Sequence, residues 1–298
     1  MFTKSLALTT VIALNLLITN NLYAKGEVKV TTTKLTDKIH MLAAQGGNVG
    51  VFIGKDGTFI IDDQFAPLTD KLMAAIKSLG GDLPKFLLNT HFHGDHSGGN
   101  ENFGKMGSMI ISHDKVRERL VKGSTIKAFN MKTPPAPAKA LPVVTFSKQM
   151  HFHINEEDVN IIHVSNAHTD GDSFVHFKNA NVIHTGDIFF NGFYPFIDAD
   201  HGGSLKGTIA AVDTILTIAN SDTKIIPGHG PLADKKQLEA YKRMLETAYA
   251  NLLKLKDEGL SAEDAKSRKP LESLDAKWGK AMFTSDRWIE VIYPAVSK

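Results

Sequence analysis

Short β-like runs, some of them alternating and others continuously apolar, predict two groups of strands along the chain. Six such runs lie in the first part, at residues 27–35, 38–42, 48–54, 58–62, 85–90 and 108–112. A helix is expected over 67–80, because apolar residues share one face there, Pro67 suits the first turn and Gly80 suits the end. Residues 113–123 predict a second helix.

The second part of the chain repeats this order of strands and helices. Further strands are expected at residues 150–154, 159–165, 173–177, 181–186 and 223–230. Helices are expected over 204–220 and 234–256, the latter with Asp234 and Gln237 as a capping box. The proline-rich residues 133–142 predict an extended connection between the halves. Two similar halves with strands inside and helices outside indicate an α/β fold in four layers.

The first 24 residues have the order of a secretory signal peptide. A basic start, MFTK, precedes an apolar stretch, and the segment ends on the small residue Ala24. We therefore expect export to the periplasm or the medium, with residues 1–24 removed. The alternative is a membrane anchor, but the apolar stretch is shorter than the ~20 residues that a spanning helix needs. Residues 25–298 are expected to form a single domain with a helical C-terminal extension from about residue 231.

Composition restricts the classes of partner. The 298 residues are 42% hydrophobic and carry a formal net charge of +2. Such a small charge gives no strong attraction to nucleic acid or to a membrane surface, so neither is expected as a partner once the signal peptide is removed. A small-molecule substrate is expected instead, and the oligomeric state is left open. The chain has no cysteine, which excludes both disulfides and a thiol nucleophile.

The segment NTHFHGDHSGGN, residues 89–100, predicts one half of a metal site. Residues two apart in an extended segment point the same way, so His91 and His93 can approach one ion together. A helix that starts at the following glycine would turn Asp95 and His96 toward a neighbouring position. Each of three more candidate ligands follows an apolar run, beside a glycine-rich turn: His168, Asp187 and His229. Imidazole and carboxylate groups are suitable ligands for zinc.

The motif HFHGDH, together with the three later residues, resembles the metallo-β-lactamase superfamily of metallo-hydrolases. The resemblance covers about residues 28–232. It implies an αββα sandwich and two zinc ions per chain, with zinc favoured over iron or manganese. It implies a first ion held by His91, His93 and His168. It also implies a second ion held by Asp95, His96 and His229, with Asp187 bridging both ions. By the same resemblance, Asp62 supports the ligands from behind the site.

This resemblance also implies a hydrolytic activity. Water activated between the two ions would attack a carbonyl or phosphoryl centre, with Asp95 as the catalytic residue that orients it and carries its proton. The ligand set with Asp187 is similar to that of glyoxalase II and the lactonases. One lactamase subgroup has a cysteine at that position and a substrate-binding lysine three residues later, where this chain has Phe190.

We therefore expect an exported hydrolase that cleaves a small ester, thioester, lactone or amide. The first alternative is a β-lactam hydrolase, because the expected export fits that activity. The second alternative is a non-catalytic metal-binding accessory protein of a periplasmic pathway.

Three features near the expected site keep two interpretations each. The aromatic residues within 189–196 either wall an apolar pocket or pack beneath their neighbours. Residues 44–49 form either a mobile loop over the site, as the resemblance implies, or a plain hairpin turn. His201 either contacts substrate or only fills its loop. His151 and His153 alternate along a strand and are expected on a solvated face.

Overall fold

A computed structural model describes residues 28–296 of the chain. The predicted signal peptide, residues 1–24, lies outside the described residues, so its removal stays a prediction. Within 28–296, no helix is both long and apolar enough to cross a membrane.

The first half of the chain forms a seven-stranded sheet. Its strands lie in the order β1-β2-β3-β4-β5-β6-β9. The first four are antiparallel, and β4, β5, β6 and β9 are parallel. The bounds are β1 Thr31–Lys34, β2 Ile39–Ala43, β3 Val49–Gly54, β4 Gly57–Ile61, β5 Phe86–Asn89, β6 Met109–His113 and β9 Val144–Phe146.

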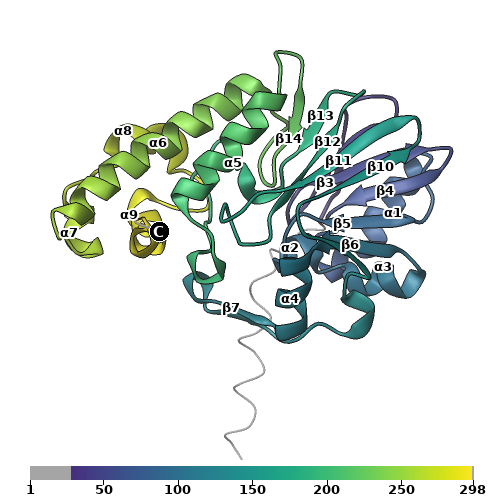
Figure 1. The fold of residues 1–298 in the computed structure, drawn as a ribbon, viewed down its shortest axis with the longest axis horizontal. Helices are drawn as coiled ribbons and strands as arrows, with labels where there is room; N and C mark the ends of the chain where they lie inside the picture. The colour runs from purple at the N-terminus through teal and green to yellow at the C-terminus, as the bar shows by residue number, and fades with distance from the viewer. Residues whose placement is uncertain (1–27, 297–298) are drawn as a thin grey trace, which may run out of the picture.

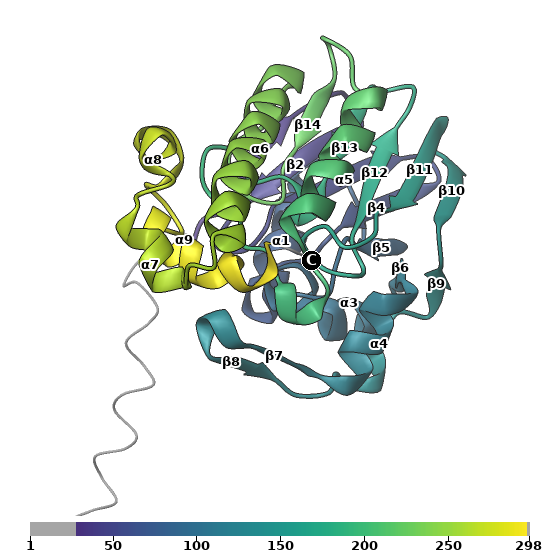
Figure 2. The ribbon, with the colours of Figure 1, turned by 60° about the vertical axis from the view of Figure 1, so that its left-hand side comes forward.

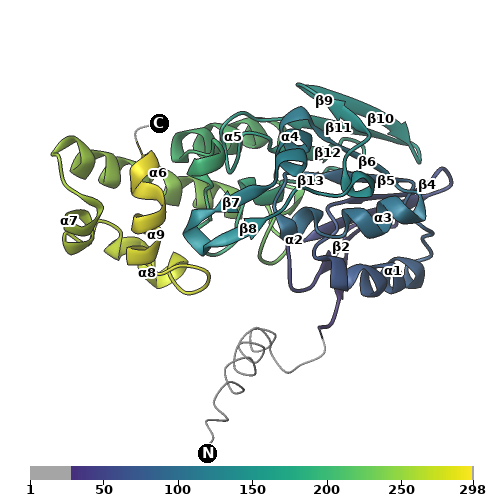
Figure 3. The same cartoon turned by 90° about the horizontal axis from the view of Figure 1, so that it is seen from below.

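Helices α1, α3 and α4 belong to the same half, and α1 and α3 lie on the outer side of its sheet (Figures 1 and 3). Their bounds are α1 Thr69–Ser78, α3 Asn100–Met106 and α4 Asp114–Lys122, with the single turn α2 at Gly94–Ser97. Alternation along β4 decides which residue faces them. Ile60 packs toward Leu72 and Ile76 of α1, whereas its neighbours Phe59 and Ile61 point to the opposite face.

The second half forms a five-stranded sheet in the order β10-β11-β12-β13-β14. All pairs are antiparallel except β13 and β14. The bounds are β10 Gln149–Ile154, β11 Glu157–His163, β12 Ser173–Phe177, β13 Val182–His184 and β14 Lys224–Ile226. Helices α5 (Leu205–Ile218) and α6 (Lys235–Asp257) lie over its outer face (Figure 1). The capping box predicted for Asp234 and Gln237 is confirmed at the start of α6.

The inner faces of the two sheets pack on each other and form the central core. Phe52 of β3 meets Phe177 of β12 edge to face, with ring centroids 5.2 Å apart. Phe59, Ile61, Val159 and other buried residues of both sheets complete this layer. Helices therefore cover both sides of a two-sheet sandwich, and the predicted four-layer αββα fold is confirmed.

Two regions differ from or add to the sequence expectations. The predicted connection at 133–142 contains a short 3-10 helix at Ala138–Ala140, and a hairpin of β7 (Ser124–Ile126) and β8 (Met131–Thr133) precedes it. Three-residue strands show too little alternation to be predicted. After α6, the described part of the chain forms three further α-helices beside α6, with a 3-10 turn at Tyr293–Ala295 after the last of them (Figure 2). Their bounds are α7 Ala262–Ser267, α8 Glu272–Trp278 and α9 Ser285–Ile292. We call these three the C-terminal helices.

Candidate metal centre

The candidate ligands meet at one edge of the sandwich, where several strands end. The parallel strands β4 and β5 lead to Asp62 and to the histidines of the HFHGDH motif. In the other sheet, His168 follows β11, Asp187 follows β13 and His229 follows β14. Strands β11, β13 and β14 run in the same direction, because two antiparallel steps separate β11 from β13. The site therefore takes residues from both sheets.

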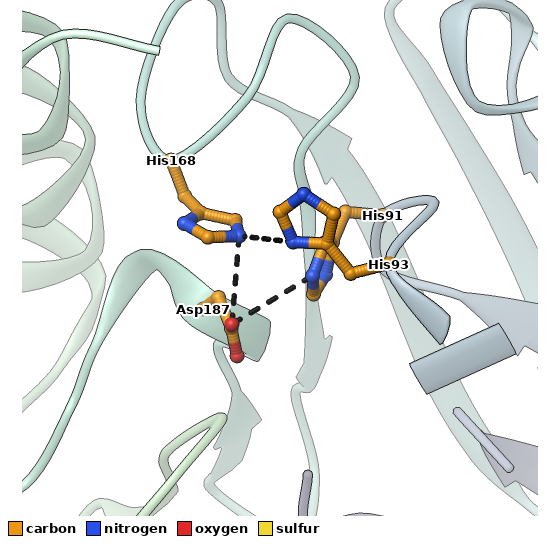
Figure 4. A group of neighbouring side chains, drawn as sticks. All are labelled: His91, His93, His168 and Asp187. Carbon is orange, nitrogen blue, oxygen red and sulfur yellow. Dashed lines mark hydrogen bonds and ion pairs between the residues drawn. The ribbon is translucent and has the colours of Figure 1, made fainter. Parts of the chain in front are cut away.

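His91, His93, His168 and Asp187 form a first group of four buried side chains (Figure 4). The Nε2 atom of His168 lies 2.9 Å from Nδ1 of His93. The Oδ2 atom of Asp187 lies 3.5 Å from Nε2 of His168 and 3.7 Å from Nε2 of His91. One atom from each residue can thus approach a single ion.

Asp95, His96 and His229 form a second group beside the first. The Nε2 atom of His229 lies 3.2 Å from Oδ2 of Asp95 and 3.3 Å from Nε2 of His96. The other oxygen of Asp187, Oδ1, lies 3.0 Å from Nε2 of His96 and 3.4 Å from Nε2 of His229. Asp187 therefore presents one carboxylate oxygen to each group, so that all seven residues expected from the sequence are brought together.

Asp62 and Thr90 hold two of these histidines from behind. The Nδ1–H of His96 donates to Oδ2 of Asp62 at 2.7 Å. The Thr90 hydroxyl donates to the same oxygen at 2.8 Å and lies 3.1 Å from Nδ1 of His91, whose N–H it can accept. Both imidazoles then carry their proton on the outer nitrogen, which leaves the Nε2 lone pair for the site.

Two acceptors hold the remaining histidines of the first group. The Nδ1–H of His168 donates to the backbone carbonyl of Phe196 at 2.8 Å, and the carbonyl can only accept. The Nε2–H of His93 donates to Oδ2 of Asp198 at 2.9 Å. The Nδ1–H of His201 also donates to this oxygen, at 2.6 Å. His201 therefore supports Asp198, a role that the sequence interpretations of substrate contact and loop filling did not include.

These contacts fit bound metal better than a protein-only network. The Nε2 atom of His91 and the Oδ1 atom of Asp187 are buried and have no hydrogen-bond partner among the described residues. Buried polar atoms without partners are costly, and a cation would satisfy both. Outer hydrogen bonds that orient imidazoles toward a common point are typical of metal sites.

The electrostatics of the site favour positive charge between the carboxylates. Burial alone would lower the pKa of His229, but the carboxylates of Asp187 and Asp95 outweigh it and raise the pKa to about 9. Burial would raise the pKa of Asp95, but His96 and His229 outweigh it and bring the pKa to about 2. Burial also lowers the pKa of His168 to about 4, so this imidazole is a neutral ligand.

Glycines allow the backbone to approach the ligands. A Cβ atom on Gly47 would lie 2.0 Å from Cε1 of His96, and one on Gly228 would lie 2.1 Å from Oδ1 of Asp187. The 44–49 segment is tied to the site, because Gly47 N donates to the Asp95 carbonyl at 3.0 Å and Asn48 N to the Gly228 carbonyl at 2.7 Å. This segment connects β2 to β3 as a hairpin turn that packs against the second group.

A cavity of about 500 Å³ opens beside the second group. Polar and apolar side chains both line it, and none of them is a lysine, arginine, aspartate or glutamate. The lining residues are Thr31, Thr33, Met41, Ala43, Ala44, Gln45, Gly46, Asn48, Phe193, His229, Gly230, Pro231 and Leu232. The side chains of Asp95 and His229 are 28% and 16% exposed, which makes them the most accessible of the seven candidate ligands.

The aromatic segment after Asp187 mostly packs inward. Phe189, Phe190 and Tyr194 are fully buried, and Phe196 is nearly so. The Phe190 ring stacks on the His229 imidazole, with centroids 5.0 Å apart. Only Phe193 of this segment lines the cavity. Elsewhere, the expectation that His151 and His153 lie on a solvated strand face is confirmed.

Sequence reasoning missed Thr90 and Asp198. Thr90 directly precedes the motif, and its role follows only from its contact with Asp62. Asp198 lies in the same DADHGG stretch as His201, but no spacing links it to His93, which is 105 positions away. Both roles depend on tertiary packing.

A two-sheet αββα sandwich that carries a cluster of histidines and aspartates at its strand ends defines a class of metal-binding hydrolases. The model of the metallo-beta-lactamase superfamily matches residues 43–229, and the chain belongs to this superfamily. That match confirms the resemblance seen in the HFHGDH motif. Members of the superfamily are generally hydrolytic metalloenzymes.

Solved structures support the fold. A metallo-beta-lactamase from Pontibacter korlensis is 19% identical, with a TM-score of 0.58, over 73% of this chain and 99% of that one. A metallo-beta-lactamase with a HARLDQ motif from Cronobacter sakazakii is 14% identical, with a TM-score of 0.62, over 76% and 95%. At such low identities the likeness concerns the fold alone.

Proposed function

We propose that the protein is a dinuclear zinc hydrolase that acts on a small, uncharged ester, thioester, lactone or amide. The observation that carries this proposal is the placement of Asp187, with one carboxylate oxygen directed at each of two ligand groups. Five imidazoles and two carboxylates are a donor set that suits zinc better than magnesium or calcium, which prefer oxygen ligands.

The first group would hold one ion and the second group another, with Asp187 shared between them. When bound, zinc supplies Lewis acidity toward a substrate oxygen and lowers the pKa of water. The protein supplies position and proton transfer. Asp95 is ionised and partly exposed beside the cavity, so its carboxylate can orient an incoming water and accept its proton.

The cavity supports an uncharged substrate. A carboxylate on the substrate would find no lysine or arginine in the lining, whereas Thr31, Thr33 and Gln45 offer hydrogen bonds and Met41 and Phe193 offer apolar contact. Phe190 takes no part, because it lies beneath His229 and is fully buried. This lining favours neutral acyl compounds over β-lactams, which carry a carboxylate.

A parallel hydrolysis screen of zinc-loaded protein tests the proposal. We expect turnover of neutral chromogenic esters, thioesters or lactones that is lost with a chelator and restored by zinc, and slow or no turnover of penicillins and carbapenems. Phosphodiesters serve as a further class in the same screen.

Two results would overturn this assignment. Efficient zinc-dependent turnover of β-lactams would establish the first alternative, which the names of the two structural relatives also suggest. An absence of turnover in every class, with two ions bound, would count against the hydrolase and favour the non-catalytic accessory protein instead.

We also propose that the protein is exported. The support is the order of basic, apolar and small residues in the first 24 positions. Intact-mass measurement after expression in a bacterial host should give a chain that begins at Lys25 and is found in the periplasm or the medium. A chain that begins at Met1 and stays in the cytosol would refute export without affecting the proposed hydrolysis.

A further inference from the structure

Residues 193–201 hold two ligands of the first group, although most of this segment has no regular structure. We call it the 193–201 loop. Its Phe196 carbonyl accepts from Nδ1–H of His168 at 2.8 Å, and its Asp198 carboxylate accepts from Nε2–H of His93 at 2.9 Å. No strand runs through the loop, and its only regular element is the 3-10 turn at Ala199–His201. Its position must therefore come from the elements packed around it.

The C-terminal helices supply much of that packing. The indole Nε1–H of Trp288 in α9 donates to the Pro195 carbonyl at 2.6 Å. The Trp288 ring also stacks on Tyr194, with centroids 4.4 Å apart and planes 13° from parallel. Both side chains are fully buried. Trp288 thus contacts the two residues that immediately precede the Phe196 carbonyl.

Helix α8 holds the same point of the loop from another side. The Tyr194 backbone N–H donates to the Trp278 carbonyl at 3.0 Å, and the Tyr194 hydroxyl donates to Oδ1 of Asp275 at 3.0 Å. The Ser285 hydroxyl at the start of α9 donates to the other oxygen of Asp275, at 3.0 Å, and so links α8 to α9. The loop is therefore tied to the C-terminal helices by backbone and side-chain contacts.

The second group has different supports. His96 is held by Asp62 at the end of β4, and the backbone around His229 pairs with Phe190 and Asn191. Asp95 contacts the 44–49 segment through its carbonyl. Within residues 28–296, no hydrogen bond or ion pair joins α7, α8 or α9 to these three ligands.

We propose that α8 and α9 of the C-terminal helices position His93 and His168 of the first group and none of the ligands of the second, with Trp288 as the main positioning residue. The proposal rests on the two-ion site proposed above. It gives the helical extension a role in the site itself. A ligand whose outer hydrogen bond is displaced binds metal more weakly, because the orientation of its imidazole is no longer fixed in advance.

Single-group backgrounds separate this role from a general effect on stability. In the His229→Ala background only the first group keeps all its ligands. In the His91→Ala/His168→Ala background only the second group does. Trp288→Phe keeps an aromatic ring against Tyr194 and removes the N–H that binds the Pro195 carbonyl. We expect it to weaken Co²⁺ binding about tenfold in the His229→Ala background and to leave binding in the other background unchanged.

Competition with a chromophoric chelator measures the affinities, and the visible absorption of bound Co²⁺ reports the geometry of the first group. Tyr293→Phe is the matched control, because it removes a hydroxyl that donates to the Leu260 carbonyl, away from the loop. It should change neither affinity. If Trp288→Phe does not fold, Tyr194→Phe takes its place, since that variant loses only the hydroxyl bonded to Asp275 and should give a smaller shift in the same direction.

An equal loss in both backgrounds, no loss in either, or a loss matched by Tyr293→Phe would refute the positioning role. If neither background binds Co²⁺ when Trp288 is unchanged, the two-ion site is refuted, and the positioning role is refuted with it. These two failures give different results and cannot be confused.

Discussion

Asp187→Asn should lower the zinc-dependent kcat/KM by about a thousandfold or more. Asp187 directs one carboxylate oxygen at each group, and an amide can offer a lone pair from one of its two terminal atoms only. The shared bridge would be lost while the side-chain volume stays almost the same. Loss of about 4 kcal/mol of metal-derived stabilisation of the transition state corresponds to such a factor.

Metal analysis should accompany the kinetics. The unchanged protein should retain about two zinc ions per chain after gel filtration, and Asp187→Asn should retain fewer, with the fold preserved by circular dichroism. Asp200→Asn is the control, because the Asp200 side chain is 42% exposed and its ion pair with Lys127 lies at the surface, so both activity and zinc content should persist. Full zinc content together with full activity in Asp187→Asn would contradict the bridging role.

Asp62→Asn should weaken the second group although Asp62 is not itself a candidate ligand, because its carboxylate holds His96 from behind. Asp62 has a backbone φ of 64°, a left-handed conformation that asparagine also adopts well, so the change introduces no new backbone strain. Its carboxylate accepts from Thr90 N, from the Thr90 hydroxyl and from Nδ1–H of His96. An amide nitrogen facing His96 would require Nδ1 to accept, which moves the imidazole proton to Nε2, the atom directed at Asp187.

We expect zinc affinity of the second group to fall about 10- to 100-fold in this variant. Because a buried ionic contact is broken as well, the free energy of unfolding should fall by about 3 kcal/mol. Chelator competition and urea denaturation measure the two effects separately.

The neighbouring Asp63 offers a matched control. It is equally buried, but its Oδ1 accepts only from Gly99 N, and its Oδ2 has no partner among the described residues. Burial raises the pKa of Asp63 well above its usual value, which favours the neutral carboxyl, so an amide should replace it at small cost. If Asp63→Asn and Asp62→Asn reduced zinc affinity equally, the argument from the His96 proton would be wrong.

The site could be predicted from the sequence because its ligands follow strands. His91 and His93 share a face of one extended segment, and Asp187 and His229 follow apolar runs at glycine-rich turns. Such local patterns are visible without tertiary structure. The repeated order of strands and helices in two similar halves likewise made the layers of the sandwich predictable, whereas the faces taken by the consecutive apolar residues Phe59, Ile60 and Ile61 are seen only in the structure.

What could not be predicted depends on contacts between distant segments. Phe190 follows Asp187 closely, yet its pairing with His229 directs it under the imidazole and away from the cavity. Asp198 supports His93 only because the 193–201 loop crosses behind the motif. The location of the C-terminal helices depends on Tyr194 and Trp288, whose contact no periodicity in either segment indicates.

The convergence of both sheets on one site links metal supply to folding. The ligands from β5 and those from β11, β13 and β14 belong to sheets that share no hydrogen-bonded strand pair in the described structure. Ions held between them would join the two halves as disulfides do in many exported proteins, and this chain has no cysteine to form a disulfide. Because only the native state assembles the ligands, the melting temperature should rise with free zinc concentration. In the metal-depleted protein, the first proteolytic cuts should fall between the two halves of the chain.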